Sequence, residues 1–181
     1  MPCDHWVRNA GHCVVLGQTG EMTTTADDVV WMLDLIESLG SVAIIGGGWG
    51  VDALFGAPTR THRDLDVLVP ERDVDRVVAA LSDRGFHVAT DWLPVRIELT
   101  DRVNDRRIDI HPAVDDEASG YWQHGFDGDR YTTPADSITH GVIGGRSVQC
   151  FTIEKQLETH QGYEPTATDL ADIETLRRLA N

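Results

Sequence analysis

The composition is that of an ordinary globular domain with a strongly acidic charge balance. The chain has 181 residues, of which 41% are hydrophobic and 25% charged, enough for one packed core. Thirty acidic residues against 15 lysines and arginines give a formal net charge of −15. Proteins that bind nucleic acid carry basic surfaces, so this balance argues against such a partner and favours small or cationic ligands. A solvated acidic surface is the alternative explanation of the charge.

Cysteine usage and hydropathy indicate a cytoplasmic protein. The three cysteines, Cys3, Cys13 and Cys150, are odd in number and lack the spacing of a metal site. No apolar run approaches the ~18 residues that a membrane-spanning helix needs, and the N-terminus lacks the pattern of a signal peptide. We therefore expect reduced thiols, a cytoplasmic location and no membrane partner.

The first 22 residues differ from the rest of the chain. They mix His, Cys, Gly and Asn without a period, which indicates a tail or an over-long start ahead of Met22. Residues 23–181 are expected to form a single domain. Its core would span 25–112, and residues 113–181 would supply a variable substrate loop and the C-terminal part.

Helices and strands alternate in the first half of this domain. Thr25 to Asp28 has the pattern of a capping box, and apolar residues at helical spacing follow as far as Gly40. The further elements that periodicity predicts here are a strand at 42–45, a short helix at 49–55, a strand at 64–69 and a helix at 74–81.

Strands dominate the second half until helices close it. The pattern predicts a strand at 86–90, a hairpin of 95–99 with 107–111, an irregular stretch at 112–140, a hairpin at 141–150, a short helix at 154–160 and a last helix capped by Thr168. This order predicts an α+β fold, with a small mixed sheet, flanking helices and a helical C-terminal end.

A glycine turn and a pair of acids make the most informative stretch. Gly46, Gly47 and Gly48 join the strand at 42–45 to a helix, and backbone N–H groups at a helix N-terminus suit phosphate oxygens. Asp64 and Asp66 alternate with apolar residues, so both side chains project from one face of their strand. Carboxylates ~6.5–7 Å apart along a strand repel each other unless a cation lies between them. A divalent metal fills that role best.

A third acid follows on a later strand. Ile108 and Ile110 are expected to face the core, which leaves Asp109 and His111 together on the other face. A third carboxylate would complete a second metal site or accept the proton of an attacking hydroxyl. His111 either lines this site or is a structural histidine. Glycines alone serve tight turns and acids often lie on solvated faces, so only the combination indicates nucleotide chemistry.

Two sequence runs carry a resemblance to a known family. GGGWGVDALFG at 46–56 and TRTHRDLD at 59–66 resemble the antibiotic nucleotidyltransferases of the DNA polymerase beta-like superfamily. The lincosamide nucleotidyltransferases are most similar, and the aminoglycoside 2''-adenylyltransferases come next. The segments that favour the lincosamide branch are WLPVRIEL at 92–99, IDIHP at 108–112, HQGY at 160–163 and DLADI at 169–173. The resemblance covers about residues 25–178, and most of 112–140 has no counterpart in it.

The resemblance implies an enzyme with a polymerase beta-like fold. Such an enzyme moves a nucleoside monophosphate from Mg-ATP, or another NTP, to a drug hydroxyl and releases pyrophosphate. Asp64, Asp66 and Asp109 match the metal-binding acids, with two Mg²⁺ ions expected. Asp109 is the first candidate for the base, and Glu98 is its competitor.

The same resemblance assigns the residues around the phosphates and the acceptor. Gly47 and Gly48 match the phosphate-contacting turn, where a side chain would block close approach. Arg60 and His62 lie between turn and carboxylates, where we expect contact with triphosphate oxygens. The expected acceptor-binding residues are Trp92, Glu98 and His111, and ordinary packing is the alternative for Trp92.

The acceptor remains open at this stage. A lincosamide-like drug is the first expectation, and an aminoglycoside or a cellular molecule would take the same chemistry. A non-catalytic nucleotide-binding module, such as half of a toxin–antitoxin pair, is the alternative from another class. A homodimer is compatible with the sequence, and no segment requires one.

Overall fold

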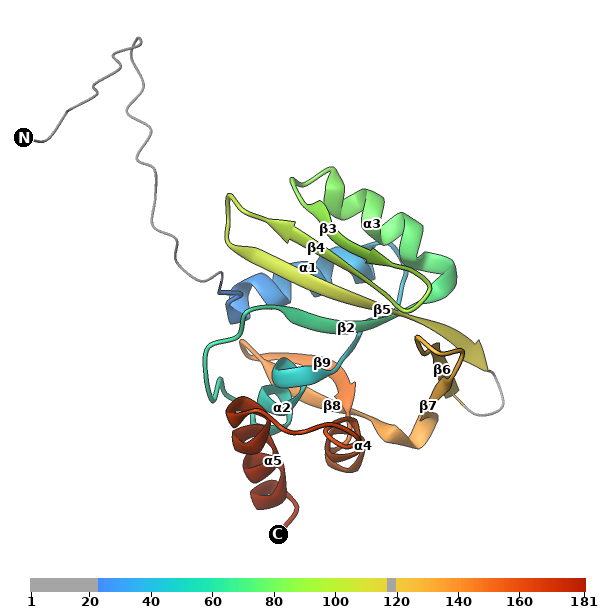
Figure 1. Cartoon of the computed structure of the whole chain (residues 1–181). Coiled ribbons are helices and arrows are strands. Elements are labelled where there is room, and N and C mark those ends of the chain that lie inside the picture. The colour runs from blue at the N-terminus through green and yellow to red at the C-terminus, as the bar shows by residue number, and fades with distance from the viewer. Residues whose placement is uncertain (1–22, 117–119) are drawn as a thin grey trace, which may run out of the picture.

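The structure is a computed structural model that describes residues 23–116 and 120–181. The expected tail at 1–22 lies outside the described residues. No helix among them is long and apolar enough to cross a membrane. Figure 1 shows a twisted sheet with α1 and α3 against its upper part and with α2, α4 and α5 gathered near β8 and β9. The α+β fold with a mixed sheet and a helical C-terminal end is confirmed.

The strands of the described residues form one mixed sheet. Its order is β3-β4-β5-β2-β1-β9-β8, and β6 and β7 continue from β5 at one end. The pairs β2–β5 and β1–β9 are parallel, while the other pairs are antiparallel. The strands are β1 (Ile44–Ile45), β2 (Leu65–Pro70), β3 (His87–Trp92), β4 (Arg96–Asp101), β5 (Arg106–Asp116), β6 (Gly120–His124), β7 (Arg130–Pro134), β8 (Ile138–Ile143) and β9 (Arg146–Phe151).

Local sequence signals explain how the helices begin and end. Thr25 and Asp28 form the expected capping box at the start of α1, and Gly56 ends α2 in the left-handed conformation. The helices are α1 (Ala26–Ser38), α2 (Gly47–Phe55), α3 (Val74–Ser82), α4 (Ile153–Thr159) and α5 (Ala167–Leu179), with short 3₁₀ turns at Glu71–Asp73 and Ala135–Ser137.

One face of the central strands is buried in the main core. Leu65 and Val67 of β2 and Ile108 and Ile110 of β5 are 0% exposed, and they belong to one cluster with apolar residues of α1, α2 and α3. Successive strand residues point to opposite faces, so the residues between them project away from this core. The opposite face therefore receives the polar side chains of β2 and β5.

Two expectations about the second half were wrong. Residues 112–140 are not an irregular stretch, because β5 runs on to Asp116 and pairs with β6, which pairs with β7. The last helix is capped by Thr166 rather than Thr168, since the Thr166 hydroxyl accepts a hydrogen bond from the Asp169 N–H. Sequence periodicity missed the β6–β7 extension because all five residues of β6 are half-buried, without alternation.

Candidate active site

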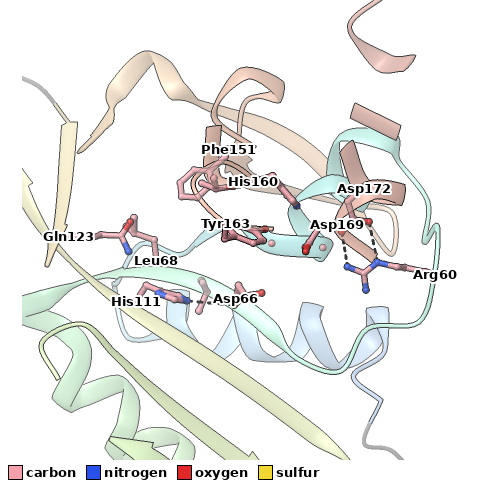
Figure 2. Close-up of a pocket in the computed structure, with 15 residues that line it drawn as sticks. Arg60, Asp66, Leu68, His111, Gln123, Phe151, His160, Tyr163, Asp169 and Asp172 are labelled. Atoms are coloured by element: carbon pink, nitrogen blue, oxygen red, sulfur yellow. Dashed lines mark hydrogen bonds and ion pairs between the residues drawn. The ribbon is translucent and has the colours of Figure 1, made fainter. Parts of the chain in front are cut away.

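A cavity of about 360 Å³ opens on the polar face of the sheet, beside the glycine turn. This volume lies at the lower end of the range for small-molecule sites. Figure 2 shows its walls, which come from the α2 N-terminus, β2, β5, β6, β9 and the segment from α4 to α5. The lining residues are Gly46, Gly47, Gly48, Arg60, Asp66, Val67, Leu68, His111, Gln123, Phe151, Thr159, His160, Tyr163, Asp169 and Asp172.

The glycine turn leaves no room for side chains. Gly47 has a φ of +53°, and a Cβ added there would overlap the Asp66 carboxylate. A Cβ at Gly48 would overlap the Arg60 guanidinium and lie 2.6 Å from His62 Nδ1. Glycine is required at Gly47 for both conformation and space. The turn therefore packs directly against the first carboxylate and the first cation of the cavity.

Three carboxylates form a row across neighbouring strands. Asp66 of β2 is paired in register with Asp109 of β5, and Asp109 is paired with Glu98 of β4. Neighbouring strands lie about 4.7–4.9 Å apart, and residues in register across them point to the same face of the sheet. The backbone N–H of Gly46 donates to the Asp66 carbonyl at 3.1 Å, so the row begins beside the glycine turn. We call Asp66, Asp109 and Glu98 the carboxylate row.

Asp109 is the most perturbed member of the row. Burial, reinforced by the charge of Asp66, raises the pKa of the Asp109 carboxyl to about 6 against the opposing effects of His111 and Arg96. Arg96 donates a hydrogen bond to Asp109 Oδ2. Among the described residues, Asp109 Oδ1 is buried and has no hydrogen-bond partner. An acceptor atom in that state is ready for a cation or a proton.

His111 joins the two aspartates in a compact group. Ligand atoms of Asp66, Asp109 and His111 all lie within 4.8 Å of one another, and His111 Nε2 is 3.5 Å from Asp66 Oδ1. Burial opposes protonation of His111, but its hydrogen bond and charge interactions with Asp66 and Asp109 outweigh it and raise the His111 pKa. Two carboxylates and an imidazole are suitable ligands for a divalent cation.

Asp64, the first of the predicted pair, lies outside this group. It precedes β2, and its carboxylate accepts hydrogen bonds from Arg63 Nη2 at 2.8 Å and Nε at 3.0 Å. The Arg63 side chain is 59% exposed, so water is free to take over its contact with Asp64.

His62 is held beneath the turn rather than in the open cavity. Its side chain is 3% exposed, and Nε2 lies 2.5 Å from Asp52 Oδ2. Asp52 also accepts hydrogen bonds from the backbone N–H and hydroxyl of Thr59, at 3.0 and 2.5 Å. The ring of Trp49 lies 4.4 Å from the His62 ring, centroid to centroid. This buried cluster fixes the loop before β2 against α2.

Arg60 lines the cavity and is held in place by a residue of the last helix, α5. Its Nη2 donates to Asp172 Oδ2 at 2.7 Å and its Nε to Asp172 Oδ1 at 3.1 Å, a bidentate pair. Asp172 is 3% exposed. Sequence patterns gave Asp172 no role beyond its place in the last helix, where it lies past the first turn that contains Asp169. Its 112-residue separation from Arg60 left no local signal of the contact.

The segment between α4 and α5 and the hairpin strand β6 supply further lining residues that the sequence did not assign. His160 bonds the Gln156 carbonyl through Nδ1 at 2.7 Å, which fixes the proton on that nitrogen. Tyr163 is hydrogen-bonded to Asp169, and burial together with that carboxylate raises the Tyr163 pKa. Gln123 extends from β6 toward the same cavity (Figure 2).

Trp92 and Glu98 lie on the far side of Asp109 from the turn. Trp92 is half exposed and is not among the cavity-lining residues. Its ring contacts Phe126 edge-on at 5.5 Å, and the Arg96 guanidinium lies 4.5 Å above it. Glu98 Oε1 is 3.6 Å from Arg107 Nε. Of the predicted acceptor residues, Trp92 and Glu98 thus lie along β3 and β4, next to the end of the carboxylate row, while His111 lies on β5 and lines the cavity.

Comparison with known proteins decides the family. The model of the aminoglycoside-2''-adenylyltransferase family matches residues 28–176. The chain belongs to this family. It is also 32% identical over 155 residues to a lincosamide resistance protein of Staphylococcus haemolyticus, covering 86% of this chain and 96% of that protein. The predicted enzyme class, a nucleotidyltransferase, is therefore confirmed.

Solved structures agree with this assignment. The lincosamide antibiotic adenylyltransferase LnuA, bound to lincomycin, superposes with a TM-score of 0.80 at 31% identity, covering 87% of this chain and 99% of that one. ANT(2'')-Ia in complex with adenylyl-2''-tobramycin gives a TM-score of 0.65 at 23% identity, covering 86% and 87%. At that identity, the second likeness shows the family's fold alone.

Proposed function

We propose that this enzyme transfers a nucleoside monophosphate from ATP, or another NTP, to a hydroxyl of a lincosamide-like antibiotic and releases pyrophosphate. The observation that carries the proposal is the glycine turn packed directly against Asp66, at the start of the carboxylate row. The turn offers backbone N–H groups to phosphate oxygens, and the row offers ligands and a base at the reacting phosphorus. Similarity to LnuA and to the staphylococcal lincosamide resistance protein supports the acceptor class.

Magnesium is the metal that we expect at the aspartates. The unpartnered Oδ1 of Asp109 and the close grouping of Asp66, Asp109 and His111 fit a divalent cation. Asp64 would join as a ligand after release from the exposed Arg63 side chain, and two ions are expected in all. Bound Mg²⁺ would neutralise the charge that develops on the transferred phosphate.

The residues around the turn would bind and orient the triphosphate. Arg60, held by Asp172, would donate to its oxygens in a fixed direction, and Gly47 and Gly48 would allow close backbone approach. His62 is buried against Asp52, so we assign it the role of supporting the turn from below.

Glu98 is the base that the geometry favours. The family resemblance makes Asp109 the first candidate for the base, but a carboxylate that binds a metal ion is less basic and accepts a proton less readily. Glu98 is next in the row, beyond Asp109, on the side where Trp92 leaves an exposed aromatic surface for an acceptor. We propose Glu98 as the proton acceptor and Asp109 as a metal ligand.

Pyrophosphate release with each NTP, Mg²⁺ and a panel of lincosamides and aminoglycosides tests the proposal. We expect turnover with a lincosamide, and at least a hundredfold loss in Asp66→Ala and Asp109→Ala. Arg63→Ala, which removes only the exposed partner of Asp64, is the matched control and should retain turnover. Turnover with aminoglycosides alone would move the acceptor to that class. Mg²⁺-independent nucleotide binding without turnover would favour a non-catalytic module.

Three further expectations accompany this function. Residues 23–181 are proposed to act as one domain, with 113–181 adapting the site to its acceptor. A cytoplasmic location, where NTPs are abundant, stays a prediction. A homodimer also stays a prediction, and sedimentation of the purified protein would test it.

A further inference from the structure

The carboxylate row defines the direction in which phosphoryl transfer would proceed. In an in-line displacement, the attacking and leaving oxygens lie on opposite sides of phosphorus. Under the proposed function, on which this argument rests, pyrophosphate leaves at the glycine turn beside Asp66. The acceptor then enters from the opposite end of the row, at Glu98. The nucleoside would then leave the row at an angle, and strand β2 offers one such line in two directions.

The two directions along β2 differ in what they offer a nucleoside. Toward its start lie Asp64 and the 59% exposed side chain of Arg63, which form no enclosed surface. Toward its end lies Leu68, two residues beyond Asp66 and on the same face of the strand. Leu68 and Phe151 belong to one apolar cluster, and both line the cavity. An aromatic base would find apolar contacts only in this second direction.

Gln123 adds a polar group at this apolar end. Figure 2 shows its side chain near Leu68, at the opposite end of the view from Arg60, with Asp66 between them. Within the two described segments, its amide makes no hydrogen bond. The cavity also carries charged groups such as His111, but an amide with free donors and acceptors beside two apolar side chains is suited to fixing the orientation of a base.

We propose that Leu68, Phe151 and Gln123 form the nucleobase subsite and that Gln123 selects adenine. A glutamine amide pairs with adenine through two hydrogen bonds, since its carbonyl accepts from the N6 amine and its NH₂ group donates to N7. Guanine presents two acceptors, O6 and N7, to the same edge, so the amide carbonyl would face a carbonyl. Gln123 is therefore a specificity-determining residue for the donor nucleotide.

Nucleotide binding to the full-length protein, measured by calorimetry with Mg²⁺ and without acceptor, tests this role. The probes are ATP, GTP and 7-deaza-ATP, which lacks N7. The wild-type protein should bind ATP roughly 5- to 150-fold more tightly than GTP, the range expected for one bidentate base contact. In Gln123→Leu, which removes the amide at similar volume, this ratio should fall to within about threefold of unity.

A second variant and a matched control keep the test sharp. Gln123→Glu keeps the acceptor for N6 but places a negative oxygen against N7, so it should bind 7-deaza-ATP more tightly than ATP, reversing the wild-type order. Gln161→Leu makes the same change at an exposed glutamine that does not line the cavity and whose amide donates to the Leu157 carbonyl at 3.4 Å. Its nucleotide preferences should equal those of the wild type. Thermal unfolding of each variant verifies that it is folded.

The outcomes separate this inference from the proposed function. Unchanged ATP-to-GTP ratios in both Gln123 variants would overturn it. An increase in the KM for the acceptor with unaltered nucleotide affinity would also overturn it, because this end of the cavity would then belong to the acceptor. Absence of Mg²⁺-dependent ATP binding in the wild type would refute the proposed function itself, independently of Gln123.

Discussion

Replacing Gly47 by alanine tests whether the glycine turn positions the first carboxylate of the site. An alanine Cβ would overlap Asp66 Oδ2 and lie 3.0 Å from its Cγ. Optimal carbon–carbon contacts are about 3.5–4.0 Å long, so the carboxylate has to move by about 0.5–1 Å. The residue also keeps a φ of +53°, which costs about 1–2 kcal/mol for a residue with a Cβ.

Gly56 provides a control with the same backbone cost and no steric contact. It has a φ of +85° at the end of the same helix, and a Cβ there would meet nothing within 4 Å. Urea unfolding should show a loss of about 1–2 kcal/mol in Gly56→Ala and at least as much in Gly47→Ala, whose Cβ also displaces Asp66. The backbone cost is therefore matched, and only Gly47→Ala adds the displacement of Asp66.

Turnover separates the two variants. A displacement of about 1 Å at a reacting group costs about 100-fold in rate, so kcat of Gly47→Ala should fall by about two orders of magnitude. Gly56→Ala should retain kcat within about threefold, because Gly56 does not line the cavity. Pyrophosphate release at saturating substrates measures both. Equal rates in the two alanine variants would refute the idea that the turn controls the position of Asp66.

Three other predictions concern buried ionisable groups. Asp172→Asn removes the charge that orients Arg60, so the Kd for ATP should rise about tenfold while kcat changes less. Unchanged affinity in an ATP titration would contradict this role of Asp172. Burial opposes ionisation of Asp101, but hydrogen bonds from Arg106, Asn104 and the backbone lower its pKa. Asp101→Asn should therefore destabilise the fold by about 3 kcal/mol above about pH 4. This loss of stability should shrink as the pH falls through the lowered pKa of Asp101. Urea unfolding at pH 7 and pH 3 measures it, and an equal loss at both pH values would refute the prediction. Burial raises the pKa of Cys150 to about 11. In a variant whose other cysteines are replaced by serine, the native protein should therefore resist a thiol reagent at pH 8 and react only after unfolding. Rapid labelling of the native protein would contradict the burial of Cys150.

Elements set by local signals were predictable from the sequence. The capping box at Thr25 and the glycine at Gly56 act within a few residues, and both appear where the pattern indicates. Strict alternation also identified the strands that carry Asp66 and Asp109. Their parallel pairing brings the two aspartates into register across 43 positions of the chain. The sequence indicated that each aspartate points away from the core, and the fold shows that Asp66 and Asp109 are neighbours on adjacent strands.

Features that depend on distant packing were not predictable. Asp172 pairs with an arginine far back in the sequence, and no local pattern distinguishes it from the other acids of the last helix. His62 has the sequence position of a phosphate ligand, yet the structure buries it against Asp52. Gln123 went unnoticed because β6 is half-buried throughout and shows no alternation. Burial and partner choice, rather than residue type, decide such roles.

The ion pair between Arg60 and Asp172 has a consequence for the order in which the enzyme becomes competent. The contact joins residues 112 positions apart and involves the last helix of the described chain. During synthesis, the sheet that carries the aspartates can form before α5 has left the ribosome. Arg60 acquires this partner only afterwards, so if Arg60 binds the triphosphate as proposed, folding of the sheet and competence for nucleotide are separate events in time.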